Sequence, residues 1–156
     1  MNITSSAFTN GEIIPARFTC QSDNVNPPLS VSDVPAAAAG LALIVDDPDS
    51  PNGVFTHWLI WNLPAAAGEI AENYAGWTEG RRGLHDAGAI NGVNDFGRVG
   101  YGGPCPSVGT HHYHFRLLAL DRTTDLAVGA DRAAFEAAIN GHIIDQAEIV
   151  GLYTLA

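Results

Sequence analysis

The chain has 156 residues, 46% of them hydrophobic and 15% charged, which is typical of one folded domain and excludes a disordered chain. Seventeen acidic residues outweigh seven basic ones, and the formal charge of -10 disfavours binding to nucleic acid, whose phosphates need clusters of basic residues. All seven basic residues are arginine, and the lack of lysine excludes a Walker A loop, Schiff-base and pyridoxal chemistry, and a Ser-x-x-Lys acyl-enzyme.

Short apolar segments bounded by Pro, Gly, Asn and Asp predict strands along the chain. The expected strands are residues 40–45, 57–63, 113–120 and 149–155. The first is apolar without interruption, which predicts that both of its faces are buried. In the third, alternate side chains lie on opposite faces, and His111 falls in phase with Tyr113.

Helical patterns occur late in the chain. Asp131 is a suitable N-cap and Asn140-Gly141 a suitable end for a helix whose apolar face contains Phe135 and Ile139. A shorter helix is expected over 143–147. Many short strands and one or two small C-terminal helices predict a mostly β domain of two packed sheets.

The two cysteines, Cys20 and Cys105, do not make a disulfide framework, and no zinc-type spacing is present. Both lie beside the loops described next, so we expect them close together in the fold; the alternative is two separate buried thiols. The N-terminus does not resemble a signal peptide, and no apolar run approaches the ~20 residues that span a bilayer. We therefore expect a cytoplasmic protein without integral membrane association.

Two proline-rich segments hold most of the functional information. Each ends in a histidine at the start of an apolar strand: Asp47-Pro48-Asp49-Ser50-Pro51 leads to His57, and Gly100 to Pro106 leads to His111. These imidazoles can donate hydrogen bonds to an anion, and either Asp47 or Asp49 can accept from a ring N–H and hold its orientation. The pattern predicts a site for a small anion or phosphate ester.

The second segment adds backbone and a phenol to this site. Gly100, Gly102 and Gly103 allow the backbone to approach a ligand closely, so that N–H groups there can cradle an oxyanion. Tyr113 offers its hydroxyl to the same place. The alternatives are that His57 and His111 are structural residues with satisfied hydrogen bonds, and that Asp47-Pro48-Asp49 is only a turn.

Templates for metal binding and nucleophilic catalysis fail. His112 and His114 share a strand face as in cupin metal sites, but Leu117, Leu118 and Ala119 stand where a carboxylate ligand is needed. A calcium loop that starts at Asp47 would require Gly and Glu at the positions where Asn52 and Trp58 stand. There is no Gly-x-Ser-x-Gly elbow, and nothing in the surrounding sequence activates Cys105.

These segments resemble the phosphatidylethanolamine-binding protein family, in particular its bacterial and archaeal branch labelled Raf kinase inhibitor-like. The resemblance covers nearly the whole chain, from Phe18-Thr19-Cys20 and Asn26-Pro27-Pro28, through Asp46 to Pro51, His57-Trp58 and Tyr101 to Pro106, to His111 to Arg116, Gly141-His142-Ile143 and Gly151-Leu152-Tyr153. Val31 stands where many bacterial relatives have Trp, and His112 stands where Arg is common.

The resemblance implies one domain over residues 1–156, a Greek-key β-sandwich with small flanking helices. It also implies a shallow pocket for phosphate, acetate or phosphoethanolamine. The implied pocket residues are Asp47, His57, Gly102, Gly103, Pro104, His111 and Tyr113, with Asp49 as a neighbouring structural acid.

The expected function is therefore non-enzymatic binding of a small anionic or phosphate-ester headgroup, with no catalytic residue, metal or cofactor. The alternative is a protein-interaction regulator, such as a kinase or protease inhibitor, that uses the pocket for docking. A cryptic hydrolase ranks last. We expect a monomer or a homodimer.

Overall fold

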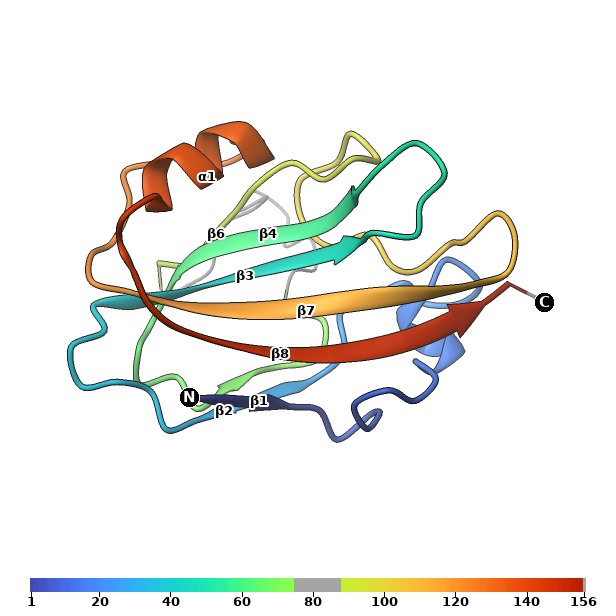
Figure 1. Ribbon diagram of the computed structural model, residues 1–156, viewed down its shortest axis with the longest axis horizontal. Helices are drawn as coiled ribbons and strands as arrows, with labels where there is room; N and C mark the ends of the chain where they lie inside the picture. The colour runs from blue at the N-terminus through green and yellow to red at the C-terminus, as the bar shows by residue number, and fades with distance from the viewer. Residues whose placement is uncertain (75–87, 156) are drawn as a thin grey trace.

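The computed structural model describes residues 1–74 and 88–155 (Figure 1). The elements are, in chain order, β1 (Asn2–Thr4), the 3-10 helix η1 (Ala16–Phe18), β2 (Leu29–Ser32), β3 (Gly40–Asp47), β4 (Phe55–Leu63), β5 (Glu69–Ile70), β6 (Ile90–Asn91), β7 (Thr110–Leu120), α1 (Arg132–Ile139) and β8 (Ile143–Thr154). None of the described helices is long and apolar enough to cross a lipid bilayer.

The strands form two antiparallel sheets. The smaller sheet has the order β1-β2-β5 and the larger β6-β4-β3-β7-β8. Because β7 returns to lie beside β3, the strands β3, β4, β6 and β7 are arranged as in a Greek key. Figure 1 shows the smaller sheet on one face of the larger sheet and α1 on the other. The predicted class of fold, two packed β-sheets with a small C-terminal helix, is confirmed.

Strand β3 lies in the middle of the larger sheet, and all eight of its residues are buried. Leu41, Leu43 and Val45 face the core between the two sheets. Ala42 and Ile44 face the opposite way, into an apolar cluster beneath α1. Antiparallel strands usually leave one face to water, so the uninterrupted apolar run of β3 reflects a sheet that is covered on both sides. The prediction of a strand buried on both faces is confirmed.

Strand β7 shows the predicted alternation. Tyr113, Phe115 and Leu117 belong to the core between the sheets, and Leu118 and Leu120 belong to the cluster beneath α1. The strand begins earlier than expected, at Thr110, because its pairing with β8 continues from Thr110 opposite Thr154 along its whole length.

The predicted cap of helix α1 is present. The Asp131 carboxylate accepts a hydrogen bond from the Ala134 N–H at 2.9 Å, which satisfies one of the free donors of the first turn. Phe135 and Ile139 bury the apolar face against the larger sheet. Just beyond the helix, Gly141 has a φ of +80°, a conformation that favours glycine and reverses the chain into β8.

The predicted short helix over 143–147 is wrong. These residues form the first half of β8 and pair with β7 from Ile143 opposite Leu120 onward. The local sequence permits a helix, but the reversal at Gly141 places it along the free edge of β7. The backbone hydrogen bonds available at that edge decide the structure.

A buried carboxylate attaches α1 to the sheet. Asp46, at the end of β3, accepts from Arg116 of β7 at 2.9 Å and from Arg132 of α1 at 2.8 Å. Arg132 also donates to the hydroxyl of Thr56 at 3.1 Å and to the exposed carboxylate of Glu136. Two partly exposed arginines thus share one carboxylate that is withdrawn from water.

Replacing this carboxylate should destabilise the fold. We expect Asp46→Ala to lower the free energy of unfolding by about 2–3 kcal/mol, since hydrogen bonds to charged groups contribute on that order. The matched control, Glu136→Ala, removes an exposed partner of Arg132 and should cost less than about 0.5 kcal/mol. Chemical denaturation of both variants measures the difference, and equal losses would contradict the role given to Asp46.

Candidate functional site

A pocket of about 490 Å³ opens at one end of the larger sheet, where β3 ends and β4 and β7 begin. Figure 1 shows the loop from β3 to β4 and the loop leading into β7 at this same end. Four of the predicted site residues line the pocket: Asp47, His57, His111 and Tyr113. The fold therefore brings together side chains from both proline-rich segments.

Asp47 and His111 form a buried pair in the pocket wall. The Nδ1 of His111 lies 2.6 Å from Asp47 Oδ2, and its Nε2 lies 3.1 Å from the carbonyl oxygen of Val108. Each ring nitrogen of His111 thus has an oxygen acceptor within hydrogen-bond distance. The other carboxylate oxygen of Asp47 accepts from the N–H of Asp49 at 2.8 Å. The pair is thus satisfied within the protein and serves as a fixed wall.

Asp49 lies outside the pocket lining and orients the next histidine. Its carboxylate accepts from both the backbone N–H of His112, at 2.8 Å, and the ring Nδ1 of His112, at 2.7 Å. This hydrogen bonding to His112 lowers the pKa of Asp49. The two acids of the first proline-rich segment therefore hold two successive histidines of β7.

His57 occupies a β-bulge in β4. Val45 pairs with Trp58 and Asp46 pairs with Thr56, so His57 has no opposite residue on β3. A bulge of this kind re-aims a side chain, and such bulges are common beside functional sites. The backbone carbonyl of His57 instead accepts from the N–H of Gly102 at 2.9 Å.

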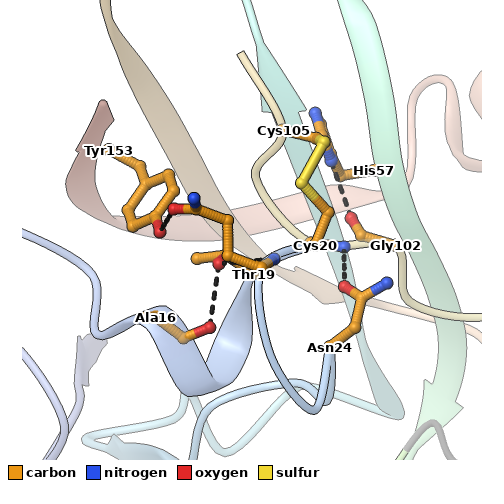
Figure 2. Close-up of a disulfide and its surroundings, with 10 residues drawn as sticks. Ala16, Thr19, Cys20, Asn24, His57, Gly102, Cys105 and Tyr153 are labelled. Carbon is orange, nitrogen blue, oxygen red and sulfur yellow. Dashed lines mark hydrogen bonds between the residues drawn. A yellow bond between two sulfur atoms is a disulfide. The ribbon is translucent and has the colours of Figure 1, made fainter. Parts of the chain in front are cut away.

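The ring of His57 is held as a neutral imidazole. Its Nδ1 donates to the carbonyl oxygen of Gly102 at 2.7 Å (Figure 2). Burial lowers the pKa of His57, although the carbonyls of Gly102 and Gly103 and the charge of Asp47 act in the opposite direction. With the proton on Nδ1, Nε2 carries a lone pair, and none of the described residues hydrogen-bonds to it.

Tyr113 carries a hydroxyl without a partner. Its side chain is 0% exposed, and none of the described residues hydrogen-bonds to Oη. The ring stacks on His111 at 6.4 Å between centroids and contacts the edge of His57 at 5.2 Å. Burial, and then the charge of Asp47, raise the pKa of Tyr113, and the nearby backbone of Cys105 opposes them in part, so the phenol stays protonated and able to donate.

The glycines of the second segment play a different part from the one expected. The N–H groups of Gly100 and Gly102 donate to the carbonyls of Gly92 and His57, and that of Gly103 donates to Asn24 Oδ1. None of them is left to cradle an oxyanion. Gly102, Gly103 and Pro104 are not in the pocket lining, and the carbonyl of Gly102 holds the ring of His57.

Close packing, and not a ligand, explains why glycine stands at 102 and 103. A Cβ on Gly102 would lie 2.4 Å from the ring of Phe96, and one on Gly103 would lie 2.3 Å from the carbonyl oxygen of Phe18. Neither position has room for a side chain.

A disulfide between Cys20 and Cys105 closes this side of the pocket (Figure 2). Cys105 lines the pocket, while Cys20 follows η1 at the start of the chain. The prediction that the two residues lie close together is confirmed, and the alternative of two separate thiols is wrong.

Sequence reasoning missed the aromatic part of the pocket. Phe55 and Phe96 line it and contact each other at 4.7 Å between ring centroids, and both contact the ring of His57. Asp95 also lines it and accepts from the N–H of Thr56 at 2.7 Å. The available signal was the turn Asn94-Asp95-Phe96-Gly97, in which a large aromatic residue stands within polar turn residues.

Comparisons with known proteins agree with this architecture. Residues 4–154 match the family described as phosphatidylethanolamine-binding protein. A UPF0098 protein of Pyrococcus abyssi is 49% identical over 96% of this chain and 83% of its own length. Another UPF0098 protein, from Methanothermobacter thermautotrophicus, is 46% identical over 98% of both chains.

Two solved structures are similar over almost the whole chain. A phosphatidylethanolamine-binding protein homologue of Chlamydia trachomatis has a TM-score of 0.88 and 36% identity, covering 99% of this chain and 97% of its own. YbcL of E. coli, described as a new member of the mammalian family, has a TM-score of 0.89 and 32% identity, covering 99% and 98%. A two-sheet β domain with a small pocket at one end of the larger sheet is the class that the structure defines. The chain belongs to the phosphatidylethanolamine-binding protein family, as its sequence motifs predict.

The state of His57 can be measured directly. We expect ring-nitrogen NMR to show a pKa below the ordinary value of about 6.5 and, at neutral pH, a proton on Nδ1 alone. Burial disfavours the charged ring, so the fold loses stability as the pH falls and this ring is forced to charge. A His57 that titrates at or above the ordinary pKa, or that carries its neutral proton on Nε2, would contradict the assignment.

Proposed function

We propose that the protein binds a small anionic or phosphate-ester group in this pocket and catalyses no reaction there. The observation that carries this proposal is the hydroxyl of Tyr113, which is buried and lacks a hydrogen-bond partner among the described residues. Leaving such a group unsatisfied costs about 1–3 kcal/mol. A ligand oxygen would remove that cost, while the lone pair of His57 Nε2 accepts a hydrogen bond from an O–H of the same ligand.

The charges of the pocket favour a ligand that still carries a proton. Among the residues that the structure describes, the lining contains the carboxylates of Asp47 and Asp95, the rings of His57 and His111, and no arginine. Because Asp47 is paired with His111, the lining offers no excess positive charge to a dianion. The site therefore suits a monoanion, such as a phosphate ester with one P–OH, which can donate to His57 and accept from Tyr113.

The arrangement does not support a reaction. Ser50 and Ser107 are the hydroxyl residues of the lining besides Tyr113, and neither is hydrogen-bonded to a histidine of the described residues. His57 is oriented by a carbonyl instead of a carboxylate, and both oxygens of Asp47 are already used. The nucleophile, base and orienting acid of acyl transfer are therefore not assembled.

Calorimetry with phosphoethanolamine and inorganic phosphate tests the proposal. We expect wild type to bind phosphoethanolamine about tenfold or more tightly at pH 5.5 than at pH 7.5, since the second pKa of a phosphate ester is about 6. At pH 5.5, Tyr113→Phe should lose about tenfold in affinity, the size of one hydrogen bond.

The controls separate binding from folding. Tyr113→Phe should be at least as stable as wild type, because it removes an unsatisfied group. Tyr153→Phe removes a phenol that bonds to Gln21 outside the pocket lining, and it should bind as wild type does. If Tyr113→Phe and wild type bound equally well, or neither bound a phosphate group, the proposed function would be wrong.

A protein-interaction regulator is the second candidate, and the rim of the pocket favours it. Val54 is 55% exposed and Phe96 38%, both in the lining, and Val108 beside it is 76% exposed. Exposed apolar side chains around a polar pocket form a surface that a protein partner could bind.

Affinity capture with matched variants tests this candidate. Val108→Asp should abolish retention of a partner, whereas Ile13→Asp, which changes a residue that is 58% exposed and lies outside the pocket lining, should not. A partner kept by both variants, or none with wild type, would count against a docking role for the rim.

A further inference from the structure

The disulfide of the pocket wall is open to solvent. Cys20 and Cys105 are 85 positions apart in the sequence, both residues are exposed, and Cys105 lines the pocket. A disulfide at the surface can be reached by external thiols, whereas one inside a core cannot. This bond thus combines access for a reductant with a place at the ligand site.

The segment that contains Cys20 also holds the loop that orients His57. Within residues 19–24, Asn24 Oδ1 accepts from the N–H of Gly103 at 2.8 Å. The adjacent residue, Gly102, supplies the carbonyl that holds His57 Nδ1 at 2.7 Å (Figure 2). A continuous series of contacts therefore leads from the disulfide to the ring that faces the ligand.

Apart from the disulfide, the close approach of Gly103 to Phe18 and a few hydrogen bonds keep these two segments together. The N–H of Cys20 donates to the carbonyl of Pro104 at 3.1 Å, and the hydroxyl of Tyr101 donates to the carbonyl of Phe18 at 2.7 Å. The turn after η1 is mostly exposed and adds no apolar residue to the core. Without a covalent bond, segments so distant in the sequence separate more readily, because they regain the freedom that the closed loop had removed.

We propose that the Cys20–Cys105 disulfide is a redox control of the pocket: the oxidised pair holds His57 in its binding orientation, and reduction releases it. This inference rests on the proposed function, since the controlled property is ligand affinity.

The reductant is a dithiol, and the exchange balances. A thiolate of the dithiol attacks one cysteine sulfur, the S–S bond breaks, and the other cysteine leaves as a thiolate that takes up a proton. The second thiol of the reagent then displaces the first cysteine, which also gains a proton. The cysteine pair gains two electrons and two protons, and the dithiol becomes a cyclic disulfide.

Two measurements on the full chain test this control. Calorimetry with inorganic phosphate compares oxidised protein, protein reduced with dithiothreitol, and Cys20→Ser, which removes the bond without changing a residue that lines the pocket. Ring-nitrogen NMR without ligand follows the Nδ1–H of His57 in the same samples. Circular dichroism shows that each sample is folded at the temperature used.

We expect reduction and Cys20→Ser to weaken phosphate binding by about tenfold each, the size of one hydrogen bond. Reoxidation should restore the affinity of wild type, and dithiothreitol should not affect Cys20→Ser. The protected Nδ1–H signal of His57 should broaden or exchange faster in both reduced and mutated protein.

The outcomes distinguish this inference from the proposed function. A change at His57 on reduction, with no phosphate binding in any sample, would support the redox control and refute the ligand. Equal phosphate binding in all samples with an unchanged His57 signal would refute the control, since a merely structural bond would alter only the stability. If reduced wild type unfolds, Cys20→Ser decides the matter, and its unfolding under all native conditions would refute a control separate from folding.

Discussion

The antiparallel register of β3 against β7 determines most of what this domain can do. Asp46 lies opposite His114, and this register brings two acids at the end of β3 and one in the loop just beyond it into contact with three residues of β7. Asp46 pairs with Arg116, Asp47 with His111 and Asp49 with His112. The two strands are buried over most of their length, so their apolar residues specify the register. The positions of the charged residues then follow from it. The polar site is a consequence of the core.

On the proposed function, the specificity of the pocket depends on which of its polar groups already form hydrogen bonds within the protein. The Asp47–His111 pair has no free donor to offer, and the glycine amides behind it are taken. In the proposed function, the ligand meets the acceptor His57 Nε2 and the hydroxyl donor of Tyr113, neither of which has a hydrogen-bond partner among the described residues. One acceptor and one donor beside aromatic side chains would select a ligand by its protonation state and shape more than by its charge. On the proposed function, this is how a chain without lysine would hold an acidic group.

Local sequence patterns predicted the features of the fold that depend on residues close together in the sequence. Burial of β3 on both faces, the alternation of β7 and the cap at Asp131 follow from period and propensity, and the structure has all three. The first half of β8 was predicted as a helix, because its strand state depends on the edge of β7 and not on its own residues. The histidines and Asp47 could be placed at one site from the motifs that contain them.

Tertiary geometry accounts for the rest of the site. The bulge at His57 arises from pairing with β3, and no residue in the segment signals it. Gly102 and Gly103 suggested an oxyanion cradle, since glycine often serves that purpose, but their lack of a side chain is required by Phe96 and Phe18. Phe96 reaches the pocket from a polar turn whose sequence does not indicate which segment it will contact. Such features are set by distant segments and become visible only in three dimensions.

The adjacent carboxylates of Asp46 and Asp47 point to opposite sides of one sheet, because side chains alternate along a strand. One secures α1 and the other forms the pocket wall. A deletion or insertion of a single residue in β3 before them would exchange their sides, removing the helix anchor and the wall together. Beyond Asp49, which holds His112, the loop from Ser50 to Val54 has no such double duty and can change in length. Evolution of ligand preference is therefore expected to proceed through the length of that loop, with the end of β3 kept constant.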